Sequence, residues 1–110
     1  MNQKDLFLKI SSNKRLFRFQ DRGHTNCIRL NPTNSKEHEF AKVEKAWELL
    51  QQGHQFIMEG ILERGDRPDL TDLTDGIHFE FAYSEEMESL EAKRKRYPLP
   101  LEIIKVKDHD

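Results

Sequence analysis

Cysteine, proline and glycine are scarce in this chain, with one, four and five occurrences among 110 residues. A single cysteine excludes an internal disulfide and a cysteine-based zinc cluster, so Cys27 is predicted to be a buried or strand thiol. Long apolar runs are also missing, because no stretch approaches the roughly 20 residues that span a bilayer. The N-terminus lacks the apolar core of a secretory signal. These absences predict a cytoplasmic protein with no membrane partner.

A surplus of charge of one sign is missing as well. The chain has 18 Lys and Arg residues against 20 Asp and Glu residues, a net charge of -2. No overall field therefore draws it to nucleic acid, and such binding would need a local patch. Charged and hydrophobic residues each make up 35% of the chain, so the apolar residues must be concentrated in a few elements. The length predicts one domain, 1–110, with a modest core that a homodimer would help to stabilise.

Apolar residues alternate weakly in the first thirty positions. They recur at Leu6, Leu8 and Ile10, then over 16–19 and 27–30, with turn residues at 11–13 and 21–23. This pattern predicts an N-terminal β-hairpin or meander, an arm over residues 1–33 that Pro32 ends. Phe17 and Phe19 alternate with arginines in this arm, which favours hairpin packing or a homodimer surface over the stacking of bases.

A helical pattern follows the arm. Asn34 has the form of an N-cap with Glu37 as its capping-box partner, and Gly53 is placed to stop the last turn. Residues 35–52 are therefore predicted to form a helix. Its large apolar residues recur at intervals of 3, 4 and 3, which predicts that they face the core: Phe40, Val43, Trp47 and Leu50.

Three strands are predicted next, over residues 54–62, 67–73 and 77–83. Ser84 is placed to cap a second helix that ends in the cations 93–96 before Pro98, and 101–106 form a last strand before a charged tail, 107–110. The order helix, three strands, helix, strand over residues 34–106 predicts an α/β domain with a mixed sheet and a right-handed crossover.

Carboxylates occupy informative places in these elements. Asp69 and Glu80 lie at the ends of two short apolar runs, so a hairpin would set them side by side at one end of a sheet. There they could hold a divalent cation through hard oxygen ligands, or simply be solvated strand ends. Glu59 lies in a strand that looks covered on both sides, which predicts that it is near a sheet end or part of a site. Glu44, beside the apolar stripe, is placed to face a cleft, whereas Glu39 is expected to be solvated.

Pro68, Asp69 and Glu80, together with this order of elements, resemble the PD-(D/E)XK nuclease superfamily. The resemblance covers residues 35–106 and implies a restriction-endonuclease-like αβββαβ core. It also implies that Asp69 and Glu80 bind Mg²⁺ or Mn²⁺ and that the protein hydrolyses phosphodiester bonds in DNA, as an endonuclease or exonuclease. The lysine expected two residues after the glutamate is replaced by Ala82.

Further site residues follow from the same resemblance. Some members carry the displaced lysine on the next helix, which would let Lys93 project back toward Glu80. The acidic residue that the family often has on the first helix or strand would be Glu44 or Glu59. Glu59 is favoured because it directly precedes the segment that leads to Asp69.

A cluster of cations near this site could contact phosphates, or could be a solvated helix end that complements the helix dipole. Its members are Arg67, Lys93, Arg94, Lys95 and Arg96. His78 shares a strand face with Glu80 and could support the site or act as a base, although an ordinary surface histidine is favoured. His38 and His54, like the other histidines, show no ligand spacing.

Two alternatives to an enzyme stay open. Because Ala82 replaces the motif lysine, the nuclease fold could be retained as an inactive module that binds nucleic acid or protein. The chain could also be a plain interaction protein that dimerises through the N-terminal arm. Salt-sensitive binding of DNA would distinguish the first alternative from the second.

Overall fold

The computed structural model describes residues 2–83 and 87–107, which form a mixed α/β fold. The described part contains three α-helices, a four-stranded mixed sheet and one short 3-10 helix. In chain order these are α1 (Gln3–Lys14), η1 (Phe19–Asp21), α2 (Lys36–Gln51), β1 (Phe56–Met58), β2 (Leu70–Asp72), β3 (Ile77–Ala82), α3 (Met87–Arg96) and β4 (Leu101–Lys105). The predicted order of helix, three strands, helix and strand is confirmed from α2 to β4.

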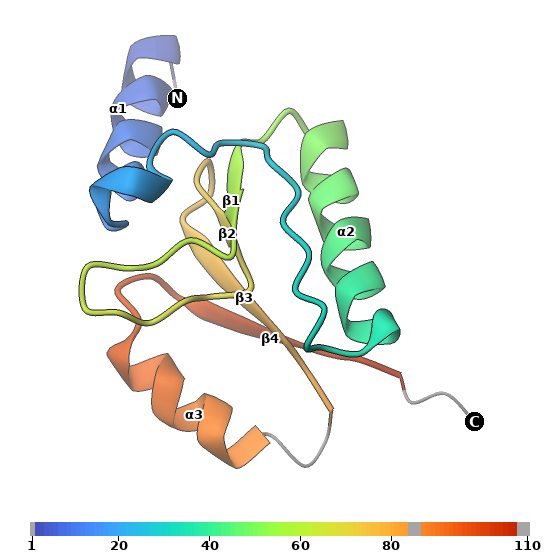
Figure 1. Ribbon diagram of the computed structural model, residues 1–110. Helices are drawn as coiled ribbons and strands as arrows, with labels where there is room; N and C mark the ends of the chain where they lie inside the picture. Colours follow the sequence, from blue (N-terminus) through green and yellow to red (C-terminus); the bar gives the residue numbers. More distant parts are fainter. Residues whose placement is uncertain (1, 84–86, 108–110) are drawn as a thin grey trace.

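The strands lie in sequence order across the sheet, β1-β2-β3-β4. β1 and β2 pair antiparallel, as do β2 and β3, whereas β4 lies parallel to β3 after the crossover through α3. α2 covers one face of the sheet, while α1 and α3 lie on the other side (Figure 1). Ala46 and Leu49 of α2 pack with Phe56, Phe79 and Phe81, and Ile10 of α1 belongs to a second cluster with Phe17, Ile57 and Tyr97.

The predicted N-terminal β arm is wrong, because residues 3–14 form the helix α1. The side chain of Asn2 caps this helix by accepting a hydrogen bond from the amide of Asp5 at 2.8 Å. Leu6 and Ile10, one helical turn apart, face the second core cluster, and Leu8 is 54% exposed. Residues that alternate along a strand also match a helix at i and i+4, so the cap and the packing decide between the two.

The helix predicted over residues 35–52 is confirmed as α2, with Ser35 as its cap instead of Asn34. Gly53, with φ of +75°, follows its end as predicted. The apolar stripe predicted to face the core does not do so, since Phe40 and Trp47 are 60% and 61% exposed. The neighbouring stripe, with Lys42, Ala46 and Leu49, is buried instead. Periodicity identifies such stripes, but it does not decide which of two adjacent ones meets the sheet.

The strands are shorter than predicted. β1 ends before Glu59, whose φ of +57° takes the backbone out of the strand. β2 begins at Leu70, so Asp69 precedes it directly. Cys27 is exposed and lies outside any helix or strand, contrary to prediction. Ser84, the predicted cap of the second helix, lies outside the described residues.

None of the helices in the described ranges is both long and apolar enough to cross a bilayer.

Candidate functional site

Asp69 and Glu80 meet at the end of the sheet, as predicted. Both residues are buried, and their side chains share a hydrogen bond. Burial and the charge of Asp69 raise the pKa of Glu80 to about 7. Burial also opposes the charge of Asp69, but hydrogen bonds from His38, Glu80 and the amide of Phe81 hold its pKa below the usual value. The pair therefore holds one proton below about pH 7, on Glu80, and loses it as the pH rises through this value.

Lys93 of α3 and Tyr97, which directly follows this helix, reach the same carboxylate. The hydroxyl of Tyr97 donates to Glu80 Oε1 at 2.5 Å, and Lys93 Nζ lies 3.4 Å from the same oxygen. Lys93 thus reaches the place that the resemblance assigned to it. Tyr97 was not identified from the sequence, although its spacing of four residues from Lys93 places both on one face of a helix.

His38, in the first turn of α2, completes the cluster from the other side of the sheet. Its Nε2 lies 3.3 Å from Asp69 Oδ2, and its Nδ1 lies 2.9 Å from Glu39 Oε2. Burial opposes protonation of the ring, but these two carboxylates outweigh it and raise the pKa of His38 to about 9. Sequence reasoning missed this residue. The available signal was the helix cap at Ser35, which fixes the first turn of α2.

A buried ion network continues from His38. Lys42, which is fully buried, lies 2.9 Å from Glu39 Oε1 and 3.0 Å from Glu59 Oε2. Glu59 Oε1 in turn lies 3.4 Å from Nε of Arg67. Glu39 is therefore buried and paired, contrary to the prediction of a solvated side chain. Hydrogen bonds from an amide, from Lys42 and from His38 overcome the effect of burial and lower its pKa to about 2.

Two candidate acids differ in their relation to this cluster. Glu59 is linked to Asp69 by a backbone hydrogen bond of 3.1 Å from its amide to the Asp69 carbonyl, and by the network through Lys42. Glu44 is exposed and lines a groove between α2 and the end of β4 instead. Of the two residues that the resemblance left open, only Glu59 is connected to the carboxylate pair.

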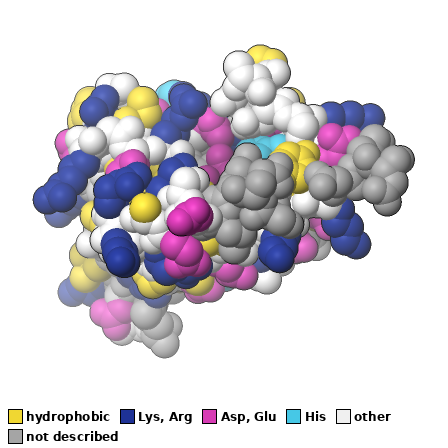
Figure 2. All heavy atoms as spheres, turned by 90° about the horizontal axis from the view of Figure 1, so that it is seen from below, with side chains coloured by type: hydrophobic (Ala, Val, Ile, Leu, Met, Phe, Trp, Pro, Cys, Tyr) yellow, Lys and Arg dark blue, Asp and Glu magenta, His cyan; other side chains and the backbone are white. Residues whose placement is uncertain are grey.

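The predicted cation cluster is divided among internal contacts. Arg94 donates to the carbonyl of Leu101 at 2.6 Å, and Arg96 pairs with Asp66 at 3.0 Å. Lys95 is exposed, and side chains of Lys and Arg are prominent over α3 on the face drawn in Figure 2. This face can present positive charge beside the carboxylate pair, because Lys93 of α3 contacts Glu80.

His78 is fully buried, so the favoured prediction of a surface histidine is wrong. Its Nδ1 is 2.7 Å from Thr71 Oγ1, and its ring packs edge-on against Tyr97 with 5.2 Å between centroids. Burial lowers the pKa of His78 to about 4. The neutral ring supports Tyr97, which in turn holds Glu80.

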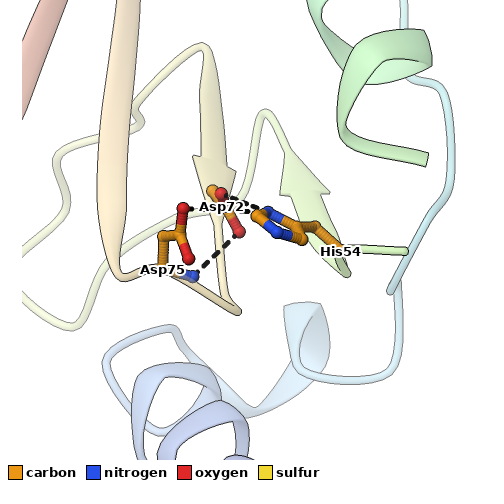
Figure 3. A group of neighbouring side chains, drawn as sticks. All are labelled: His54, Asp72 and Asp75. Atoms are coloured by element: carbon orange, nitrogen blue, oxygen red, sulfur yellow. Dashed lines mark hydrogen bonds and ion pairs between the residues drawn. The ribbon is translucent and has the colours of Figure 1, made fainter. Parts of the chain in front are cut away.

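A second polar cluster joins β1 and β2 at the opposite end of these strands (Figure 3). His54 Nδ1 lies 2.9 Å from Asp72 Oδ2 and 3.9 Å from Asp75 Oδ2. The other oxygen of Asp72 accepts hydrogen bonds from the backbone amides of Thr74 and Asp75, at 2.9 and 3.1 Å. These contacts close the turn before β3, which accounts structurally for the side chains of His54 and Asp72, whereas the carboxylate of Asp75 is 55% exposed.

The arrangement as a whole places two buried carboxylates, an imidazole, a lysine and a tyrosine hydroxyl at one end of the sheet. Such a set can bind a cation or hold and move a proton. Comparisons with protein-family models, with curated proteins and with solved structures found no match to this chain.

Proposed function

We propose that this protein is a metal-dependent nuclease of the PD-(D/E)XK type that hydrolyses phosphodiester bonds in DNA, with Asp69 and Glu80 as the metal ligands. The observation that carries the proposal is the meeting of these two buried carboxylates beside Lys93. Two adjacent acids in a protein interior cost stability when both are ionised, and such perturbed groups gather at functional sites.

The order of elements supports the proposal. From α2 to β4 the chain follows the αβββαβ order that the resemblance implies, and its sheet is mixed. We propose in addition that these elements are arranged as in the restriction-endonuclease-like fold.

The donor set suits Mg²⁺ or Mn²⁺, since carboxylate oxygens are the ligands that these ions prefer. When bound, the ion would supply neutralisation of phosphate charge and a water of lowered pKa. Asp69 is the ionised oxygen donor, and Glu80 becomes one when its proton leaves. His38 holds Asp69 in place through Nε2, and Tyr97 orients Glu80 through its hydroxyl.

Lys93 is proposed to replace the motif lysine, whose expected position is occupied by Ala82. Glu80 and Ala82 are two residues apart in β3, so their side chains lie on the same face of the strand. α3 brings Lys93 Nζ to within 3.4 Å of Glu80 at this site. An ammonium group at this place can stabilise the charge that develops on a phosphate oxygen. Arg67, Arg94, Lys95 and Arg96 are the proposed contacts to the backbone of DNA.

The test is a calorimetric titration of Mn²⁺ with a cleavage assay on single-stranded, duplex and branched DNA. We expect Asp69→Asn to abolish metal binding and cleavage, and Glu91→Gln, on the exposed side of α3, to change neither. Lys93→Met should retain metal binding but lose at least a hundredfold in rate, whereas the control variant Lys4→Met, at an exposed position of α1 outside the proposed site, should lose little. Divalent-dependent cleavage by pure Asp69→Asn protein would refute the proposal.

The second candidate function is an inactive nuclease fold that binds nucleic acid, and Ala82 is the observation that favours it. It predicts DNA binding that weakens steeply with salt and depends on Arg67 and the α3 cations, without turnover. Metal binding without cleavage of any substrate would support this candidate over the enzyme. Binding that is unchanged when those charges are reversed would exclude it.

A further inference from the structure

Large apolar side chains are exposed along α2. Phe40, Trp47 and Leu50 are 60%, 61% and 40% exposed, and Val43 between them is partly exposed. Scattered apolar residues are normal on a surface, but four on one helical stripe form a continuous strip. Trp and Phe are also the side chains that most often carry the binding energy of protein interfaces.

A groove of about 590 Å³ lies directly beside this stripe. α2 forms one wall, the chain at the end of β4 forms the other, and the two lie side by side (Figure 1). Phe81, Ile104 and Val106 give the groove an apolar lining. Phe40 belongs to both the stripe and the groove, so ridge and groove are one continuous surface.

The two walls carry opposite charge. Three acids on the α2 wall, Glu37, Glu44 and Glu48, outnumber the one cation there, Lys45, so this wall is net acidic, whereas Lys105 and Lys107 lie on the β4 wall. A surface with charge of only one sign would repel a second copy of itself. This surface is instead complementary in charge to a copy related by a two-fold rotation. A two-fold axis parallel to the groove sets the helix of each copy over the β4 wall of the other, acid against base.

From these features we propose that the occupant is a second copy of this chain, with the α2 ridge of each copy seated in the groove of the other. The contact is isologous and closed, so it yields a dimer and not a filament. Trp47 lies at the middle of the ridge and becomes buried. A 16-residue helix is about 24 Å long, which suits an interface near the standard size of about 800 Å² per partner.

The chain contains one tryptophan, so its fluorescence reports on this surface without a label. In a dilution series followed by sedimentation equilibrium, we expect a dimer, with Trp47 emission moving to shorter wavelength as the dimer forms. Trp47→Ala should weaken dimerisation at least tenfold. Phe19→Ala is the matched control, because Phe19 is 84% exposed on η1 and lies outside the proposed interface.

A charge exchange tests the orientation. Lys105→Glu with Lys107→Glu should weaken the dimer at least tenfold, and adding Glu44→Lys with Glu48→Lys should restore it. Thermal unfolding confirms that each variant is folded. A chain that is monomeric up to millimolar concentration overturns the proposal and leaves this face to a different partner. A dimer that tolerates Trp47→Ala, or a charge exchange that does not restore binding, overturns it equally.

Discussion

Glu80 shows how a single residue can oppose stability. Its carboxyl is buried next to ionised Asp69, and the pKa of about 7 means that folding is penalised once the proton leaves. In the proposed metal site, this cost would be a trade of stability for activity. The cost falls on the metal-free protein, because a bound cation would compensate the second negative charge.

We therefore expect Glu80→Gln to stabilise the metal-free protein. The amide keeps the shape of the protonated acid and can accept from Tyr97, yet it never ionises. The gain should approach about 3 kcal/mol at pH 8, from a pKa raised from 4.5 to about 7, and should vanish near pH 4.5. Urea unfolding of both proteins at the two pH values measures it. A variant less stable than wild type at pH 8 would show that Glu80 is held by its contacts and not against them.

At the scale of elements, α2 is fixed to β1 by a buried charge. Lys42 bridges Glu39 of the helix and Glu59 after the strand, with its side chain fully buried. Removing one member of such a network leaves the others as uncompensated buried charges. The packing of α2 against the end of β1 therefore depends on one ammonium group.

Lys42→Met keeps the length and apolar volume of this side chain but removes its charge. We expect a loss of about 3–5 kcal/mol in the free energy of unfolding, the usual cost of breaking a buried pair. Lys45→Met is the matched control on the same helix, where the pair with exposed Glu48 should contribute about 1 kcal/mol or less. Equal losses for the two variants in urea unfolding at pH 7 would contradict the assigned role of Lys42.

How well the sequence predicts an element depends on which interactions hold it. The second helix and the order of strands were predictable, because caps, turns and periodicity are local. The meeting of Asp69 and Glu80 followed from strand order alone. α1 was misread because Leu6 and Ile10 fit both periods, and the buried face of α2 was misread because tertiary ion pairs with Lys42 select it. His38 was not predicted as a site residue for the same reason, because only the tertiary fold brings its side chain to Asp69.

At the scale of the whole molecule, three buried groups control how stability depends on pH. The pKa of His78 falls from 6.5 to about 4, so stability is lost as the pH falls below 6.5 and the unfolded chain takes up the proton. Glu80 acts in the opposite sense between pH 4.5 and 7, because the folded protein holds its proton. The pKa of His38 rises from 6.5 to about 9, so its contribution is complete below 6.5 and is lost as the pH rises through 9.

The sum predicts a flat stability profile from pH 4.5 to 6.5, followed by a decline between pH 7 and 9 of about 3 kcal/mol, at 1.36 kcal/mol for each pKa unit of His38. Denaturant unfolding across this range measures the profile. His78→Gln should unmask Glu80 and make stability fall with rising pH between 4.5 and 7. His38→Gln should remove the decline above pH 7, because no imidazolium remains to lose its proton. A wild-type protein that gains stability from pH 7 to 9 would mean that His38 is not held between the two carboxylates of Asp69 and Glu39 in solution.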